Sequence, residues 1–244
     1  MSRIWTDEQL AEMAKRTIDK AFDAIDSGES HKAKELVQRM YDQFVHLHDG
    51  YMVWIAGLLT WIYERHGAEG VEDAESEAHA KEAKLVFLPP ERTDFQFLVE
   101  KMAAELQGHV HQHMTLTEDD EKVVLTNTPC GSGGRLIQMG GYSPEVGLGR
   151  IAEPSDLTFQ TPDYPLYCVH CPLFNRNAID DTGDFLFINN PPGDGTSCRF
   201  IFYKDKKDIP EEYYKRLGRE KPKEGGGLEV STNKSEADNQ WRTI

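Results

Sequence analysis

The apolar residues in the first hundred positions recur at helical spacing. Thr6 and Gln9 have the spacing of a capping box, so a first helix is predicted to begin there. A Ser-Gly-Glu-Ser turn at residues 27–30 ends it, and Ser30 caps a second helix. The apolar stripes of the two helices are Leu10, Met13, Ile18, Phe22 and Ile25, and Ala33, Leu36, Val37, Met40, Phe44 and Leu47. The two helices are expected to pair as a hairpin.

Residues 51–63 are apolar almost all round, which predicts a central helix covered by its neighbours. The aromatic residues Tyr51, Trp54, Trp61 and Tyr63 are therefore expected to be core residues rather than the lining of a pocket.

A polar junction precedes this central helix. His46 and His48 are two residues apart, so on a helix they point away from each other and are not expected to share one metal ion. Asp49 is expected to act as a helix cap there. The alternative is that one of the two histidines faces the functional site with Asp49 as its orienting partner. Two polar helices are predicted to follow the central one, over 71–84 and 91–106.

Beyond Gly108 the pattern changes to strands and turns. Strands are predicted over 109–117, 122–126, 185–189 and 199–203, and the acidic run at 118–121 reads as a solvated turn. The fold class is therefore α+β: a helical half at 1–107, packed as one integrated unit on a mostly antiparallel sheet in a Cys- and His-rich half at 108–218. Residues 219–244 read as a disordered tail.

Charge and composition narrow the partners. The chain of 244 residues has a formal net charge of −15, which disfavours a nucleic-acid partner because phosphate binding relies on clustered Lys and Arg. No signal peptide and no membrane span are recognisable, so a cytoplasmic protein is expected. In a reducing compartment its four cysteines are expected to be thiols that bind metal or react, with a small molecule as the partner.

Three histidines open the second half of the chain. His109, His111 and His113 stand at i, i+2 and i+4, so on a strand all three side chains leave the same face. Converging imidazoles hold zinc or ferrous iron with an open position, or move protons. Such a strand also serves simply as a polar face toward water. These three and His170 are the candidate catalytic histidines.

The second candidate is a glycine-rich loop around Cys130. Gly133 and Gly134 let backbone amides approach a bound anion closely, with Ser132 beside them, and Arg135 would hold a carboxylate. These four are the candidate substrate-binding residues. The same amides would acidify a thiolate at Cys130. The alternative is an ordinary glycine-rich turn with a buried cysteine.

The third candidate is the pair Cys168 and Cys171, which encloses His170. A Cys-x-x-Cys pair binds one metal ion, and Cys130 and Cys198 are available to complete a four-thiolate site. A redox dithiol requires the start of a helix, whereas the prolines at 162, 165 and 172 predict a loop. Inert buried thiols are the remaining alternative.

These elements carry a family resemblance. With Leu47-His48-Asp49, Pro-Cys-Gly-Ser-Gly-Gly-Arg at 129–135 and Tyr-Cys-Val-His-Cys at 167–171, the chain resembles, over most of 7–218, a group of little-characterised bacterial proteins. More distantly, residues 168–198 are similar to L-2-amino-thiazoline-4-carboxylate hydrolase-like proteins and to vinyl-reductase-type small-molecule-binding domains. The former resemblance implies opening of a small heterocyclic ring by water, and the latter a cysteine-held zinc beside a ligand pocket.

The leading expectation is a metal-dependent enzyme, a hydrolase or lyase, acting on a small anionic organic molecule. One transition metal ion, zinc before iron, would be held by Cys168, Cys171 and Cys198, with Cys130 or a histidine as the fourth ligand. The alternatives are a small-molecule-binding module with a structural zinc, a metal-free hydrolase with Cys130 as nucleophile, and an interaction protein that uses the helical half. A homo-oligomer is also possible on this reading.

Overall fold

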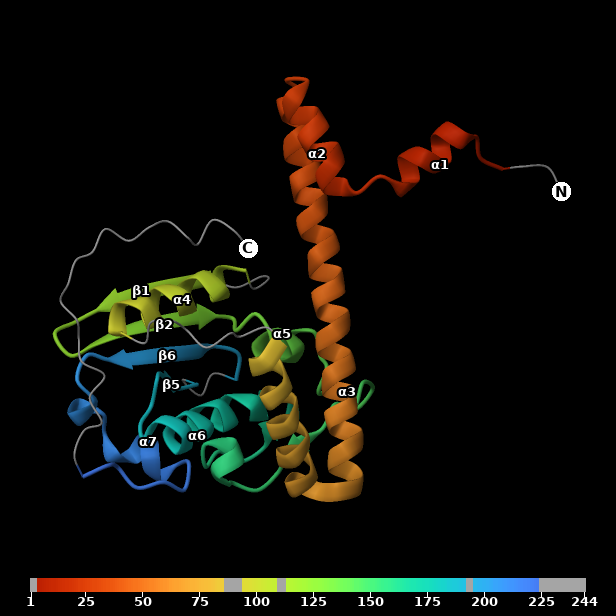
Figure 1. Ribbon diagram of the computed structural model, residues 1–244. Helices are drawn as coiled ribbons and strands as arrows, with labels where there is room; N and C mark the ends of the chain where they lie inside the picture. The colour runs from red at the N-terminus through yellow and green to blue at the C-terminus, as the bar shows by residue number, and fades with distance from the viewer. Residues whose placement is uncertain (1–3, 86–93, 109–112, 192–194, 224–244) are drawn as a thin grey trace. The chain divides into compact units, whose positions relative to one another are not determined.

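The computed structural model describes residues 4–85, 94–108, 113–191 and 195–223, with the side chains of 83–85 excepted. The chain divides into two compact units, Met1–Val53 and Trp54–Ile244. The expected halves instead met at residues 107–108, which lie inside the second of these units. The α+β expectation is confirmed: long helices precede a four-stranded antiparallel sheet (Figure 1).

The first unit is helical. Its first helix, α1 (Asp7–Ala14), begins with the predicted capping box, in which Gln9 N donates to Thr6 Oγ1 (3.3 Å) and Thr6 N to Gln9 Oε1 (2.9 Å). This helix stops earlier than predicted because Lys15 is extended, and α2 (Thr17–Asp26) follows separately. Thr17 Oγ1 donates to Gln43 Oε1 (2.7 Å), so α2 is tied to the next helix after the predicted turn.

That next element, α3 (Ser30–Leu85), spans 56 residues and consists of two helices that join at a kink, where Gly67 is non-helical (φ 68°). Separate helices were predicted over 30–47, 51–63 and 71–84. The break between the first two is wrong, because one helix runs through both ranges, whereas the break between the second and the third is confirmed by the kink at Gly67. No proline interrupts the segment, and a single Gly50 is tolerated inside a helix. Asp49 is accordingly not a cap: it lies within the helix beside His48, with 3.5 Å between Oδ1 and Nδ1.

The expectation that the helix over residues 51–63 would be covered on all sides is also wrong. Tyr51, Trp54 and Trp61 are each at least half exposed, and only Tyr63 packs against the core. The small or aliphatic residues Ala56 and Leu59 form the face that the chain buries. One apolar face of the helix is thus partly exposed.

The main sheet has the strand order β1-β2-β6-β5 and is antiparallel throughout. Its strands are β1 (His113–Glu118), β2 (Lys122–Thr128), β5 (Ile188–Asn189) and β6 (Cys198–Tyr203). The acidic run forms the β1–β2 turn as expected, where Asp119 N donates to Lys122 O (3.0 Å). Strand β5 is shorter than predicted: the Phe185 amide donates to the side chain of Asp184 (2.7 Å) instead of to a neighbouring strand. A second, two-stranded sheet joins β3 (Arg150–Ile151) to β4 (Tyr164–Pro165).

Short helices surround the main sheet. They are α4 (Phe95–Gln107), α5 (Gly133–Gln138), α6 (His170–Thr182), α7 (Glu211–Lys215) and the 3₁₀ turns η1 (Asp156–Thr158), η2 (Leu166–Val169) and η3 (Lys206–Asp208). The loop predicted around the Cys-x-x-Cys pair is wrong, because η2 runs directly into α6. Pro172 is tolerated in the first turn of α6, where its missing N–H would have no helical partner.

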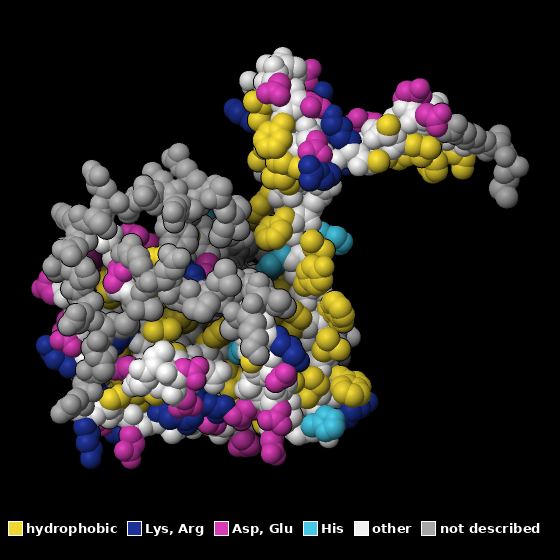
Figure 2. Space-filling model, viewed as in Figure 1, with side chains coloured by type: hydrophobic (Ala, Val, Ile, Leu, Met, Phe, Trp, Pro, Cys, Tyr) yellow, Lys and Arg dark blue, Asp and Glu magenta, His cyan; other side chains and the backbone are white. Residues whose placement is uncertain are grey.

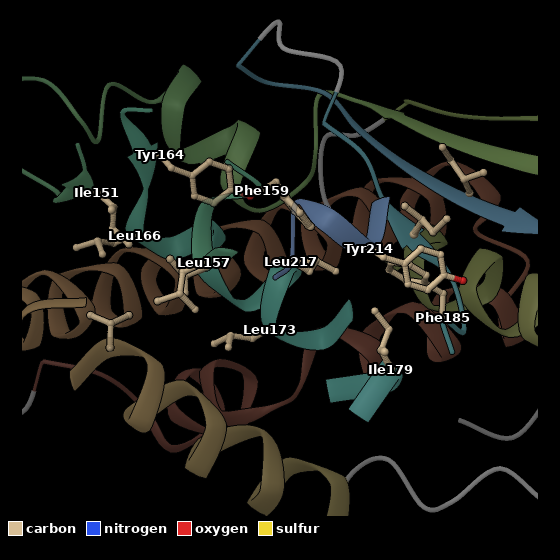
Figure 3. Packing of buried hydrophobic residues seen from close by; sticks show 14 of the residues in the cluster. Ile151, Leu157, Phe159, Tyr164, Leu166, Leu173, Ile179, Phe185, Tyr214 and Leu217 are labelled. Carbon is tan, nitrogen blue, oxygen red and sulfur yellow. The ribbon is translucent and has the colours of Figure 1, made fainter. Parts of the chain in front are cut away.

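The core of the second unit lies between the sheet and helices α6 and α7, which lie below the sheet in Figure 1. Leu173 and Ile179 of α6, Tyr214 of α7 and Phe185 pack together there (Figure 3). Asn175 ties α6 to β5, since its Oδ1 accepts from Asn189 N (2.8 Å) and its Nδ2 donates to Phe187 O (3.1 Å). None of the described helices is long and apolar enough to cross a membrane.

Candidate functional site

All four cysteines of the chain come from segments that meet at one end of the main sheet. Cys130 lies in the turn between β2 and α5, Cys168 in η2, Cys171 in the first turn of α6, and Cys198 begins β6. All four are free thiols; Cys198 is buried and the other three are half-buried.

The glycines of the Cys130 loop make this meeting possible. Cys130 N donates to Thr196 O (2.7 Å), which ties the loop to the segment that enters β6. A Cβ on Gly134 would stand 1.9 Å from that same oxygen, and one on Gly133 would stand 2.4 Å from the Cys168 Sγ. Both glycines are therefore needed for close packing inside the protein, where the sequence alone suggested a cradle for a ligand.

The thiols influence one another electrostatically. Burial, as the largest cause, raises the pKa values of Cys168, Cys171 and Cys198 above the ordinary thiol range. Repulsion adds to this effect: Cys171 and Cys130 raise the pKa values of both Cys168 and Cys198, and Cys130 raises that of Cys171. The four thiols therefore form one cluster, called the thiol cluster below. Without a compensating cation, three of them are neutral at pH 7.

Tyrosines and an arginine border the thiol cluster. Burial and the neighbouring sulfurs raise the pKa values of Tyr164 and Tyr167, and the Tyr164 hydroxyl donates to Cys168 O (3.4 Å). Burial lowers the pKa of Arg216 to about 10, while nearby groups that include Cys198 work in the opposite direction. Arg216 Nη1 donates to Asn190 Oδ1 (2.9 Å) and Nη2 to Asn189 O. The guanidinium is thereby fixed close to the cluster.

Two buried asparagines beside Cys198 keep unused hydrogen-bonding capacity. Asn127 is opposite Cys198 in the β2–β6 register and only 1% exposed, yet neither polar atom of its side chain has a partner. The side chain of Asn189 lowers the pKa of Cys198 and so favours its thiolate form. The Asn189 Nδ2 atom makes no hydrogen bond of normal geometry. Amide donors of this kind stabilise thiolate charge at metal sites.

An acid and two histidines adjoin the thiol cluster on the α6 side. Glu75 of α3 is buried, and burial raises the pKa of its carboxyl, whereas the charge of His170 lowers it. His79 Nε2 lies 3.5 Å from Glu75 Oε2, and burial lowers the pKa of His79 to about 4. His79 also stacks on Phe174, with ring centroids 4.1 Å apart. Cys171 experiences the Glu75 charge, so the two groups are neighbours.

The sequence did not single out Glu75, His79, Asn127 or Asn189. Glu75 and His79 are at i and i+4 on a helix, which is a recognisable spacing, but they lie in a long run of charged residues that reads as a solvated face. Asn127 and Asn189 are polar residues on otherwise apolar strands. That contrast was the available signal for both.

The predicted histidines have mixed outcomes. His109 and His111 lie outside the described residues, and His113 is exposed at the start of β1, opposite Thr128. His170 is adjacent to the cluster, with Nδ1 2.6 Å from Tyr167 O. Ser132 hydrogen-bonds the Tyr167 side chain, and Arg135 follows in α5. The structure therefore groups His170 and the glycine loop with the cysteines.

The donor set suits a thiophilic ion. Four soft sulfur ligands select zinc or iron over magnesium or calcium, and the unpartnered Asn127 amide is placed to stabilise thiolate charge. Within the described part of the chain, no group of three His, Cys, Asp or Glu side chains is arranged so that it could hold a metal ion. The cysteine side chains would have to turn toward a common centre to bind one.

Comparisons with protein-family models, with curated proteins and with solved structures each give no match.

Proposed function

We propose that the second unit is a zinc-binding module in which Cys130, Cys168, Cys171 and Cys198 together hold one ion. The observation that carries this proposal is the convergence of all four cysteines, from three separate segments, into one cluster of free thiols. Buried thiols that repel one another's ionised forms gain most from a divalent cation, because it compensates both burial and mutual repulsion.

Four protein ligands close a zinc site, so the role we propose for the ion is structural. It would fasten the Cys130 loop, the start of α6 and the first residue of β6 to one another. The surrounding amides of Asn127 and Asn189 would donate to the thiolates. A structural zinc ion thus takes precedence over the metal-dependent hydrolase or lyase.

A catalytic role for the metal is the second candidate, and one observation favours it. Glu75 and His79 have pKa values displaced in opposite directions next to Cys171, and such pairs are frequent at catalytic sites. In that case Cys130 would not bind the metal, and the fourth coordination position would be open to water or substrate. Glu75 would then receive or donate the proton, with Arg135 orienting an anionic substrate.

The test is metal content and coordination. Protein purified under reducing, chelator-free conditions is expected to contain about one zinc ion per chain by elemental analysis. Cys168→Ala and Cys198→Ala are expected to lose it, while His113→Ala, at an exposed position, retains it. A metal-free preparation that also fails to take up added zinc at micromolar concentration would refute the site.

Cobalt substitution separates the two candidates. Four thiolates around Co²⁺ give intense sulfur-to-metal charge-transfer and tetrahedral d–d absorption that added azide does not change. An open position is shown by a change of the d–d bands with azide. We expect no change in the wild-type protein and an azide-sensitive spectrum in Cys130→Ala.

A further inference from the structure

Strand β1 forms one edge of the main sheet, and no other strand among the described residues pairs with its outer side (Figure 1). Its pairing with β2 is continuous over all six residues, and it contains no proline, glycine or lysine. Five of its six residues are exposed. The opposite edge, β5, is two residues long and both are buried. Of the two edges, β1 is therefore the one with the length and exposure to accept a further strand.

The alternation of the β1–β2 ladder shows which backbone groups of β1 point outward. Asp119 N donates to Lys122 O (3.0 Å) at the turn, so these two residues form a hydrogen-bonded pair. Because such pairs alternate along antiparallel strands, Thr117 and Thr115 direct their N–H and C=O groups toward β2. The residues that direct theirs to the outer side are Met114, Leu116 and Glu118.

The same register leaves an apolar side chain of β1 partly uncovered. Leu116 is opposite Leu125 of β2, so both side chains lie on the same face of the sheet. Leu125 is fully buried, whereas Leu116 is 47% exposed. The buried face of the sheet therefore ends before its outermost strand, and an added strand would cover Leu116.

We infer that β1 pairs antiparallel with β1 of a second copy of this chain, so that the two main sheets join into one across a twofold axis at Leu116. In this register Leu116 lies opposite Leu116 of the second copy, and Met114 lies opposite Glu118. These outward-facing residues exchange two backbone hydrogen bonds per pair. Between them Thr115 lies opposite Thr117, and β-branched pairs of this kind stabilise a sheet. The two Leu116 side chains, on one face, cover each other.

The distribution of charge favours this register. The chain has 42 Asp and Glu against 27 Lys and Arg, and acidic side chains are spread over the visible surface (Figure 2), so two copies repel each other in most orientations. Antiparallel pairing of β1 keeps the acidic turns at residues 118–121 at opposite ends of the joined strands, whereas parallel pairing would bring them together. Asp119 comes opposite His113 of the second copy, and Glu118 comes opposite Met114.

The order of residues in β1 is self-complementary. An apolar residue stands at the centre, a threonine on each side of it, a histidine at one end and carboxylates at the other. An identical strand in antiparallel orientation requires this order, and an unrelated strand does not. We therefore favour a second copy over another protein or another segment of the same chain.

The experiment is the molar mass of the full chain under reducing conditions, measured by sedimentation equilibrium over a range of concentrations. The wild-type protein is expected at twice the chain mass and should dissociate on dilution. Leu116→Lys is expected to raise the dimer dissociation constant at least about 10-fold, because two ammonium groups would lie directly opposite each other. Thr115→Lys is the matched control. It adds the same charge on the other face of β1, opposite Thr117, and should remain dimeric.

Amide hydrogen exchange locates the interface. The outward-facing amides of Met114, Leu116 and Glu118 are expected to become protected as the concentration rises, whereas those of Thr115 and Thr117 are protected by β2 at every concentration. If Leu116→Lys loses its native circular dichroism spectrum, Met114→Pro replaces it and is expected to weaken the dimer. Proline at this position removes an N–H that points away from β2, which an edge strand tolerates.

Three outcomes would overturn the inference. One is a wild-type chain that stays monomeric at 100 micromolar. Another is a monomer whose outward-facing β1 amides are nevertheless protected, since another segment of the same chain would then cover this edge. The third is a dimer that both Leu116→Lys and Met114→Pro leave intact, because its interface would lie elsewhere.

Discussion

Gly133 packs directly against Cys168, so closely that a Cβ at position 133 would stand 2.4 Å from the Cys168 Sγ. We therefore expect Gly133→Ala to force this thiol aside and to lower the free energy of unfolding by about 1–3 kcal/mol, with loss of zinc binding. Gly57→Ala is the control, because nothing lies within 4 Å of its Cβ position in α3. It should stabilise the protein by up to about 1 kcal/mol. Urea unfolding at pH 7.5 measures both, and equal effects would refute the packing argument.

Chelation tests the structural role of the proposed ion. A strong chelator is expected to destabilise the wild-type protein, by about 4 kcal/mol relative to protein in which free zinc is kept at 1,000 times its dissociation constant. Cys198→Ser should be less stable than wild type in zinc and insensitive to the chelator. Thermal unfolding with and without zinc measures this. A wild-type melting curve that ignores both zinc and chelator would leave the thiols without a structural ion.

A buried arginine ties α6 to two other segments. Arg176 is 9% exposed, and its Nη1 donates to Asp156 Oδ2 (3.0 Å) and its Nη2 to Glu72. Arg176→Leu should cost about 2–4 kcal/mol of unfolding free energy, because both carboxylates lose their cation. Arg219→Leu breaks a comparable pair with Asp180 at the surface and should cost less than about 1 kcal/mol. Denaturant titration of both variants decides whether burial sets the difference.

The shifted pKa of His79 predicts a pH dependence. Burial lowers that pKa to about 4 from an ordinary value of 6.5, so the unfolded chain binds a proton between these values that the folded chain does not. The contribution of neutral His79 to the free energy of unfolding is complete above pH 6.5. It declines as the pH falls from 6.5 toward 4 and does not change further below pH 4. Glu75 acts in the opposite sense, since its raised pKa makes stability fall as the pH rises above its unfolded value of 4.5.

The experiment compares wild type with His79→Gln in urea, on chelator-treated protein, from pH 7.5 to 4. The difference in free energy of unfolding between wild type and His79→Gln should decrease as the pH falls from 6.5 toward 4. His31→Gln, at an exposed position of α3, is the matched control for removal of one imidazole. A difference between wild type and His79→Gln that does not change with pH would show that His79 is not held neutral by burial.

Local patterns in the sequence were sufficient for much of the fold. The capping box at Thr6, the turn at Gly28 and three of the four strands of the main sheet follow from neighbouring residues, since caps, turns and strand alternation are short-range effects.

Tertiary structure decided the rest. Only the folded chain shows that Gly133 and Gly134 serve packing against Cys168 and Thr196, and that Cys130 and Cys198 arrive beside the Cys-x-x-Cys pair. Exposure of Trp54 and Trp61 could not be predicted either, because an apolar helix has the same sequence whether its own chain or a partner covers it. Burial and proximity between distant segments depend on the whole chain, and they determine the shifted pKa values.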